Sequence, residues 1–395
     1  MIIEIIGKFY DNQSLTIINR EMAIGLSKLH DVYITPLDQI DAEAKVSKNK
    51  IKKIKELEQK DLSRPSDIDE DIKEDIIPDI QIRHSYPPVW RWPVDEKTKV
   101  VFIQPWEWQK IPFEWQYKWE QFADALIVPS MWEADNILNS GLNPNKLFIV
   151  PNGYDPKIFN REPAAPVQGI DPDKFNFVYV GCPQWRKGLD ILLNAWSKTF
   201  TSGDNARLII KDTPQVYGGN NILNEIVKLQ YNSSCAPILY LDDNLSHEEL
   251  ASIYKNSKCI VHPYRAEGFG MHIQEAVACG CVPLVSSNGP SDEFTPDVGI
   301  KFEMTTQNIN INAPEVFALK PGDATTLMST HTSVQEPTID SVSNAMRHLY
   351  MHHEKDQFFD KVNNFKLENS WENVIVKYNE VLTTVNANSK TNRNN

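Results

Sequence analysis

The chain has 395 residues, of which 41% are hydrophobic and 24% charged, and its formal net charge at pH 7 is −13. This composition is typical of globular proteins, and the length favours two domains over a single core. The acidic balance disfavours a nucleic-acid partner, whose phosphates would be repelled. The sequence has no run of about 20 apolar residues to span a membrane. Its five cysteines are scattered among apolar neighbours, which favours reduced thiols in a cytoplasmic protein.

Short apolar runs alternate with amphipathic stretches in the first half of the chain, as in βα units around a parallel sheet. The apolar start lacks a basic region and a small-residue cleavage site, so it is interpreted as a strand and not as a signal peptide. The strands predicted for this half are residues 2–6, 31–35, 100–103, 125–128 and 147–150.

A charged insertion, residues 36–80, interrupts this pattern with a lysine-rich stretch, Lys45–Lys60, and then an acidic one, Asp67–Asp79. Isoleucine and leucine recur at helical spacing in the lysine-rich stretch, which predicts one helix. Its lysines form either a solvated face or a contact with anionic lipid headgroups, and the latter would give peripheral association with the inner face of a membrane. The acidic run that follows favours the solvated face.

Proline and polar residues between positions 151 and 170 indicate a linker, after which a second series of alternating elements begins. Residues 303–335 are polar and irregular, and they are long enough to form a lid or a disordered insertion. The elements predicted for this half are strand 175–180, helix 188–198, strand 206–211, helix 221–230, strand 237–241, helix 246–256, strand 258–262, helix 271–279, strand 282–286, and helices 340–351 and 371–382.

Together these elements predict an α/β protein with two Rossmann-like, doubly wound domains. We expect the first domain to comprise residues 1–168 and the second to comprise residues 169–370. A C-terminal helix, residues 371–388, and a disordered tail, residues 389–395, should follow.

The densest chemical pattern is EGFGMHIQE, which runs from Glu267 to Glu275 between a predicted strand and a predicted helix. Its glycines let the backbone pass close to a ligand, and the free N–H groups of the first helical turn can bind an anion. A tight turn with two capping glutamates is the alternative. The glycine pair between two glutamates favours ligand binding. Glu267, at the mouth of a cleft, is a candidate catalytic residue, and the donor-binding set is Gly268, Phe269, Gly270, Met271 and Glu275.

Basic residues follow two other predicted strands, at the edge where parallel sheets bind ligands. Arg186 and Lys187 come shortly after strand 175–180. A guanidinium fork and an ammonium group at this place can neutralise a diphosphate. Lys211 ends the strand RLIIK. A solvated basic pair and an ordinary strand-end lysine are the alternatives, and all three residues are candidates for donor binding.

The segment from residue 83 to residue 119 contains six tryptophans. Flat indole rings on loops suit stacking on sugars, whereas a packed core is the alternative. The candidates for acceptor binding are Trp106, Glu107 and Trp108. The candidates for a catalytic role on this side are His84 and Gln104, although a lone histidine is more often structural.

Residues 265–290 resemble the signature of glycosyltransferase family 4 (group 1), whose members are retaining enzymes with the GT-B fold, two Rossmann-like domains facing a central cleft. The resemblance implies that Glu275 contacts the nucleotide ribose and that Glu267 approaches the transferred sugar. It also implies that the glycine turn faces the diphosphate. Lys187, followed by glycine, matches the diphosphate-binding lysine of the family.

Two positions depart from the family pattern. The family often has an arginine directly after the strand-ending glycine, where this chain has Cys182, so Arg186 would take over that role. The usual acceptor-side histidine is replaced by Gln104, and His84 is a candidate substitute.

The resemblance covers about residues 84–388, and it leaves 36–80 and 303–332 unmatched. It includes Ser370-Trp371-Glu372, before a helix that in the family crosses back to the first domain. The implied reaction transfers a sugar with retention from a nucleoside diphosphate sugar to a glycan or lipid-linked acceptor, in cell-surface polysaccharide or glycoconjugate synthesis. We expect no cofactor and no metal, because no Asp-x-Asp pair lies near the donor site. The alternatives are a phosphorylase-like sugar-phosphate enzyme on the same fold and a catalytically degenerate binding scaffold.

Overall fold

The structure, a computed structural model, describes residues 1–41, 44–58, 77–93, 95–108, 111, 113–212, 221–309, 332–353 and 355–391. It divides into two compact units. The first contains Met1–Trp106, Phe113–Gly153 and Asn369–Asn395, and the second contains Glu107–Pro112 and Tyr154–Glu368. Most of the expected acidic run and the last four residues of the expected tail lie outside the described residues.

The second unit begins at Tyr154, earlier than the boundary expected after residue 168. The Tyr154 hydroxyl donates a hydrogen bond to the carbonyl of Leu367 at 3.3 Å. The Arg161 guanidinium donates to the carbonyl of Val362 at 2.6 Å. These contacts hold the residues that were expected to form a linker on the second unit.

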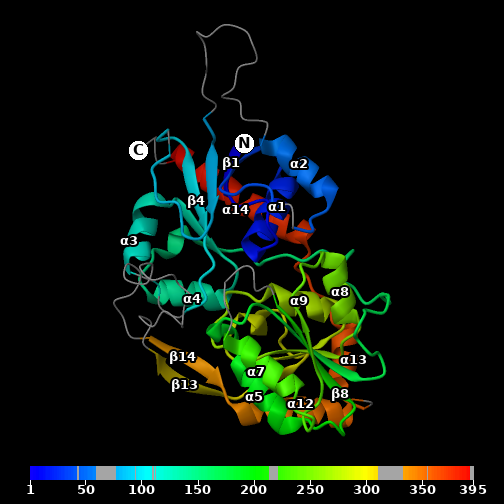
Figure 1. Ribbon diagram of the computed structural model, residues 1–395. Helices are drawn as coiled ribbons and strands as arrows, with labels where there is room; N and C mark the ends of the chain where they lie inside the picture. Colours follow the sequence, from blue (N-terminus) through cyan, green and yellow to red (C-terminus); the bar gives the residue numbers. More distant parts are fainter. Residues whose placement is uncertain are drawn as a thin grey trace. The chain divides into compact units, whose positions relative to one another are not determined.

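Six parallel strands form the sheet of the first unit, in the order β2-β1-β3-β4-β5-β6. Figure 1 shows β1 and β4 of this sheet. In β4, Val101 and Ile103 face the core that includes the last helix, whereas Phe102 packs against the Trp90 ring. Strand side chains therefore alternate between two covered faces, as in doubly wound sheets. The strands are β1 (Ile2–Gly7), β2 (Asp31–Pro36), β3 (Ile80–His84), β4 (Lys99–Ile103), β5 (Ala125–Val128) and β6 (Leu147–Ile149). The helices are α1 (Ser14–Leu26), α2 (Lys48–Glu58), α3 (Phe113–Phe122), α4 (Met131–Asn139) and α14 (Trp371–Thr391), with a short 3-10 turn η1 (Pro144–Lys146).

Two helices at the margins of the first unit complete its core. The lysine-rich stretch forms α2, which buries Ile54 and Leu57 and exposes most of its lysines. Helix α14 extends past the predicted end at residue 388 and packs on α1. A Cβ added to Gly25 of α1 would lie 2.4 Å from Ile375 of α14. The two helices therefore approach closely because position 25 is glycine.

The sheet of the second unit is also fully parallel, in the order β12-β11-β10-β7-β8-β9. Strands β7 and β10 are neighbours, so the loops that follow them lie side by side at the carboxyl edge. The strands are β7 (Phe175–Val180), β8 (Ala206–Lys211), β9 (Ile238–Leu241), β10 (Cys259–His262), β11 (Val282–Ser286) and β12 (Ile300–Phe302). The helices are α5 (Leu189–Thr199), α7 (Asn221–Gln230), α8 (His247–Lys255), α9 (Met271–Ala278), α12 (Ile339–His352) and α13 (Gln357–Asn364), with 3-10 turns η2 (Trp185–Lys187) and η3 (Pro290–Glu293).

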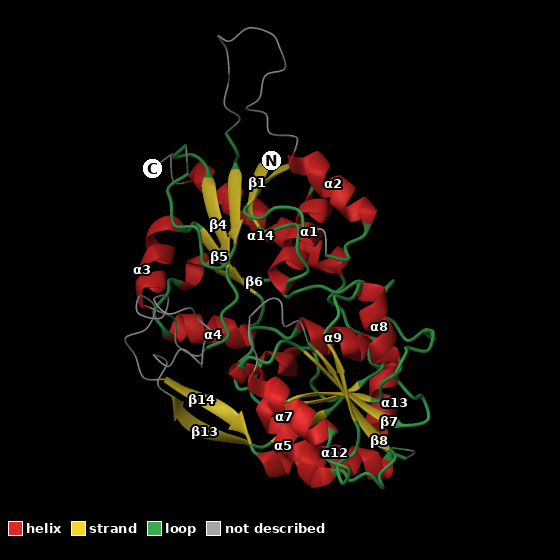
Figure 2. Cartoon of the chain, in the orientation of Figure 1, coloured by secondary structure: helices red, strands yellow, loops and turns green. Residues whose placement is uncertain are grey.

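The stretch expected to be irregular, residues 303–335, instead contains both sides of an antiparallel ribbon (Figure 2). Strands β13 (Met304–Ile309) and β14 (Thr332–Pro337) pair along their whole length. A two-stranded ribbon buries little of either face, so its polar sequence carries weak strand periodicity. Within the part of the chain that the structure describes, no helix combines the length and apolar character needed to cross a membrane.

Candidate functional site

The candidate site lies where the loops after β7 and β10 meet. Gly188 has a φ of 71°, and a Cβ at this position would lie 1.8 Å from the carbonyl oxygen of Pro263. The backbone N–H groups of Arg265 and Ala266 both donate to the carbonyl of Arg186, at 2.6 and 3.2 Å. The backbone thus fixes turn η2 against the loop that leads into α9.

Two cations converge on the buried carboxylate of Glu267. Lys187 Nζ lies 2.6 Å from Glu267 Oε2, and Arg186 Nη1 lies 3.5 Å from the same oxygen. Burial alone would raise the pKa of Glu267, but Lys187 and Arg186 outweigh it and hold the pKa at about 2. Glu267 is therefore an ionised carboxylate at neutral pH. The structure brings together residues from two distant parts of the sequence that were predicted to share a site.

A second carboxylate also contacts this cluster. Glu107 Oε1 lies 2.9 Å from Arg186 Nη2, and Glu107 belongs to the second unit although Trp106 before it belongs to the first. Glu107 was a candidate for acceptor binding, and here it contacts a cation that was expected to bind the donor. The cluster contains two cations and two carboxylates, so an incoming diphosphate would compete with carboxylates for Arg186 and Lys187.

Glu275 lies one turn into α9, after the left-handed Gly270 (φ 94°) that precedes the helix. Glu275 is 7% exposed, and no hydrogen bond or ion pair of its carboxyl group occurs within the described residues. Burial raises the pKa of Glu275 to about 8, because an unpaired carboxylate is poorly solvated there. Glu275 is therefore a neutral carboxylic acid at pH 7, and it can both donate and accept hydrogen bonds.

The other predicted donor residues differ in what their side chains do. The Phe269 ring packs on Phe294 at 4.8 Å between centroids, so it supports the loop from the core side. Met271 is buried at the start of α9, and the backbone N–H of Gly268 lies 3.3 Å from Glu267 Oε1. Lys211 ends β8 and is buried, with Nζ donating to the carbonyl of Asp212. Burial lowers the pKa of Lys211.

Two histidines beside this cluster were not among the predicted site residues. The rings of His262, at the end of β10, and His272, in the first turn of α9, lie 4.1 Å apart, and His262 stacks on Tyr179. Burial lowers the pKa of both rings, with His272 at about 3. Three of their ring nitrogens are buried without a partner in the described part of the chain. Their position around the EGFG motif was the only sequence signal that could have identified them.

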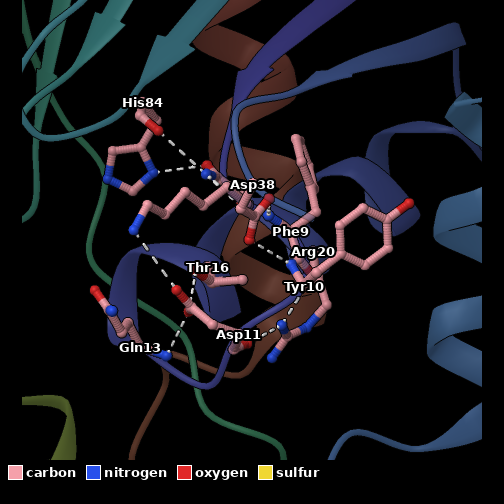
Figure 3. Close-up of polar contacts among 10 residues, drawn as sticks. Phe9, Tyr10, Asp11, Gln13, Thr16, Arg20, Asp38 and His84 are labelled. Carbon is pink, nitrogen blue, oxygen red and sulfur yellow. Dashed lines mark hydrogen bonds and ion pairs between the residues drawn. The ribbon is translucent and has the colours of Figure 1, made fainter. Parts of the chain in front are cut away.

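A separate polar network lies at the carboxyl edge of the first unit's sheet (Figure 3). The Asp38 carboxylate accepts hydrogen bonds from the backbone N–H groups of Phe9 and Tyr10, each at 2.9 Å. The buried Arg20 guanidinium donates to the carbonyl groups of Phe9, at 3.0 Å, and Asp11. These contacts fix the loop that follows β1.

His84 ends β3 beside this loop and is fully buried. Its Nδ1 lies 2.7 Å from Oδ1 of Asn19, while Asn19 Nδ2 donates to the carbonyls of Lys8 and His84 at 3.0 and 3.1 Å. Because the amide nitrogen of Asn19 serves those two carbonyls, its oxygen must accept, and the proton of His84 must be on Nδ1. Nε2 then carries a lone pair and has no partner among the described residues. Burial lowers the pKa of His84 to about 3, so the ring is neutral.

The remaining acceptor-side candidates are mostly packed. Gln104 is buried after β4, with its amide nitrogen 3.5 Å from the carbonyl of Pro105. The Trp106 ring packs on Trp115 at 5.1 Å between centroids. Four of the six tryptophans are buried and Trp92 is strongly exposed; the buried ones are Trp106, Trp108, Trp115 and Trp119. The packed-core interpretation therefore describes most of this cluster, and acceptor binding by Trp106, Glu107 and Trp108 stays a prediction.

No group of three or more His, Cys, Asp or Glu side chains lies in a metal-binding arrangement within the described ranges. The five cysteines are unpaired and buried. Independence from a metal stays a prediction.

Residues 160–302 match the model of the family described as glycosyl transferases group 1. This segment contains both loops of the candidate site, with Lys187, Glu267 and Glu275. This part of the chain is therefore similar to the group 1 glycosyl transferases, the family that its motifs predicted.

Curated relatives match over about two fifths of the chain. A D-inositol 3-phosphate glycosyltransferase 1 from Catenulispora acidiphila is 29% identical over 174 residues, which cover 42% of this chain and 41% of the relative. A D-inositol 3-phosphate glycosyltransferase from Rhodococcus opacus is 26% identical over 175 residues, 42% of this chain and 38% of the relative. The match thus spans about two fifths of the length of these curated relatives.

Solved structures resemble the whole chain. HepE from Anabaena, in complex with UDP and glucose, matches with a TM-score of 0.57 at 11% identity, over 97% of this chain and 100% of that chain. A sucrose-phosphate synthase from Thermosynechococcus elongatus matches with a TM-score of 0.62 at 15% identity, over 98% of this chain and 99% of that chain. At these identities the likeness shows the fold. The predicted GT-B class, with two Rossmann-like α/β domains, is confirmed.

Proposed function

We propose that the chain transfers a sugar from a nucleoside diphosphate sugar to a hydroxyl group of a glycan or lipid-linked acceptor, with retention of the anomeric configuration. Its place would be in the synthesis of cell-surface polysaccharides or glycoconjugates. One observation carries the proposal most directly. Lys187 and Arg186 converge on Glu267 beside the N-terminus of α9, within the segment that matches the group 1 family.

The reaction breaks the bond between the anomeric carbon and a diphosphate oxygen, and it forms a bond from that carbon to the acceptor oxygen. Negative charge develops on the leaving diphosphate, which takes up the acceptor proton. Lys187, Arg186 and the first N–H groups of α9 are placed to stabilise this charge. For that, their contacts with Glu267 and Glu107 would give way to phosphate oxygens.

Glu275 would hold the nucleotide through hydroxyl groups of its ribose. A neutral, buried carboxyl group that has no hydrogen-bond partner among the described residues offers one donor and one acceptor to such hydroxyls. Two ribose hydroxyls would bind both the donor and the acceptor of this carboxyl group. Burial of the group would then cost less free energy than it does in the protein without nucleotide.

The alternatives fit the structure less well. A phosphorylase would need further free cations near Glu267, but the nearest one in sequence, Arg265, contacts the carboxylates of Asp190 and Glu336. A degenerate scaffold would not need to keep Lys187 paired to a buried Glu267. The relative from Catenulispora acidiphila is a glycosyltransferase of D-inositol 3-phosphate, which supports transfer to a hydroxyl-bearing acceptor.

The proposal is tested by a hydrolysis screen with UDP-, GDP- and ADP-sugars, in which release of free sugar is measured without any acceptor. We expect slow hydrolysis of at least one donor, because water can replace the acceptor hydroxyl. Loss of that hydrolysis in Glu267→Gln would support the role of Glu267 near the sugar. Absence of hydrolysis with every donor, together with absence of nucleotide binding, would exclude the transferase.

A further inference from the structure

Arg265 lies two residues before Glu267 and is almost completely buried, with 4% of its side chain exposed. Its Nη1 and Nη2 donate to the two oxygens of Asp190 at 2.8 and 2.7 Å. Nη1 also donates to the carbonyl of Trp185 at 2.6 Å, and the guanidinium lies 4.2 Å from the centre of the Trp185 ring. Nε pairs with Glu336. The loop that carries Arg265, turn η2, helix α5 and strand β14 therefore meet at this side chain.

These contacts leave Arg265 no free charge for a ligand. A guanidinium has five N–H donors, and contacts with Asp190, Glu336 and a carbonyl use at least four of them. Two carboxylates balance its positive charge. Arg265 therefore differs from Arg186 and Lys187, whose contacts are with the cluster that would receive the diphosphate.

Arg265 binds turn η2 through both its side chain and its backbone. Its side chain binds the carbonyl of Trp185, and its backbone N–H binds the carbonyl of Arg186 at 2.6 Å. Asp190, the bidentate partner, lies in the first turn of α5, directly after η2. Lys187 lies between these attachment points, with its Nζ 2.6 Å from Glu267. A shift of η2 would thus move Lys187 and Arg186 together.

We propose that Arg265 is a positioning residue that fixes η2, so that Arg186 and Lys187 stay in place beside Glu267, and that Glu336 ties ribbon β13–β14 to the same point. The inference rests on the proposed function, because the two cations matter for binding a nucleoside diphosphate. It adds a residue that touches no ligand itself and a ribbon that the sequence did not predict.

The test compares Arg265→Met with Arg347→Met in the full chain. Arg347 is a matched control, because it pairs with Asp204 at 2.7 Å and lies near the rings of Phe200 and Tyr350 in the same unit. Calorimetry would measure the affinity of each variant for UDP, GDP and ADP. We expect Arg265→Met to weaken the nucleotide that binds best by roughly tenfold or more, and Arg347→Met to leave it unchanged.

A second measurement does not depend on nucleotide. The rate at which acetic anhydride acetylates Lys187, followed by peptide mass spectrometry, should rise severalfold in Arg265→Met and stay unchanged in Arg347→Met, because a loosened turn frees the Lys187 amine from Glu267. Arg265→Lys should give intermediate values, since an ammonium group can pair with Asp190 but cannot reproduce the fork. Thermal unfolding of each variant would confirm that it is folded.

The possible results distinguish failure of the proposed function from failure of the positioning role of Arg265. If the wild-type chain binds none of the three nucleotides while Lys187 reactivity still changes in Arg265→Met, the proposed function fails and the positioning role stands. If Arg265→Met is folded and has wild-type affinity and wild-type Lys187 reactivity, the positioning role is overturned.

Discussion

At the scale of single residues, the two glutamates of the motif have opposite electrostatic environments. Lys187 and Arg186 overcome the effect of burial at Glu267 and keep its pKa at about 2. At Glu275 no cation of the described residues opposes burial, which raises the pKa to about 8. One is an anion and the other an acid at neutral pH. Two residues of the same type therefore have opposite protonation states, which suits the roles proposed for them, a charged group near the sugar and a neutral group that binds ribose hydroxyls.

Glu275→Gln tests this assignment through stability. The folded pKa of about 8 lies above the ordinary value of 4.5, so the folded state retains a proton that the unfolded state loses as the pH rises. The contribution of Glu275 to wild-type stability must therefore fall between about pH 4.5 and pH 8. Glutamine does not titrate, so the free energy of unfolding of Glu275→Gln relative to wild type should grow by at least about 1 kcal/mol across that range. Urea denaturation at both ends measures it, and a pH-independent difference would refute the assignment.

His84 carries a second prediction about protonation. Asn19 fixes the proton on Nδ1 and burial lowers the pKa to about 3, so nitrogen NMR should show a neutral ring with a bare Nε2 from about pH 5 to pH 8. The variant Asn19→Asp should raise the pKa of His84, because a carboxylate favours the imidazolium. His84→Gln identifies the signal. A proton on Nε2 in the wild-type chain would show that the amide of Asn19 is oriented the other way.

At the scale of elements, the site depends on how closely the loops after β7 and β10 approach. Gly188→Ala should therefore destabilise the chain by at least about 2 kcal/mol and weaken nucleotide binding, because position 188 needs both a left-handed backbone and no Cβ. Gly203→Ala is the matched control, since its Cβ would meet no atom closer than 3.7 Å. Denaturant unfolding of both variants checks the difference, and equal stability would contradict the account of this loop.

The sequence predicted most elements of the second unit because buried parallel strands and amphipathic helices have strong periodicities. The ends of β7 and β10 and the start of α9 matched within a few residues, which located Lys187, Glu267 and Glu275 at one edge. Ribbon β13–β14 was not predicted, because its residues are polar and bury little surface. The contacts of Arg265 with Asp190 and Glu336 were not predicted either, since long-range pairing of charges has no local sequence pattern.

On the acceptor side, the sequence left more open. From the sequence, the tryptophans could either stack on sugars or pack in the core. Trp115 and Trp119 are buried, so this part of the cluster belongs to the core. The salt bridge from Glu107 to Arg186 could not be foreseen, because it depends on residues 107–112 belonging to the second unit. The burial of the tryptophans and the salt bridge of Glu107 both depend on tertiary structure and not on local spacing in the sequence.

At the scale of the whole molecule, the predicted functions fall on different units. Arg186, Lys187, Glu267 and Glu275 lie in the second unit, whereas His84 lies in the first. Two cations, Arg186 and Lys187, nevertheless lie together beside Glu267 in a chain with a net charge of −13. Binding of a nucleoside diphosphate should therefore depend on the cations of the second unit, whatever the acceptor is.

Calorimetric titration of the wild-type chain with UDP, GDP and ADP tests whether the cations of the second unit bind a nucleoside diphosphate. We expect at least one of the three nucleotides to bind. We expect Lys187→Ala to weaken that binding by roughly tenfold or more, and Lys99→Ala, which removes an ion pair with Asp124 in the first unit, to leave it unchanged. Failure of all three nucleotides to bind the wild-type chain, or wild-type affinity in Lys187→Ala, would show that Lys187 is not part of a nucleotide site.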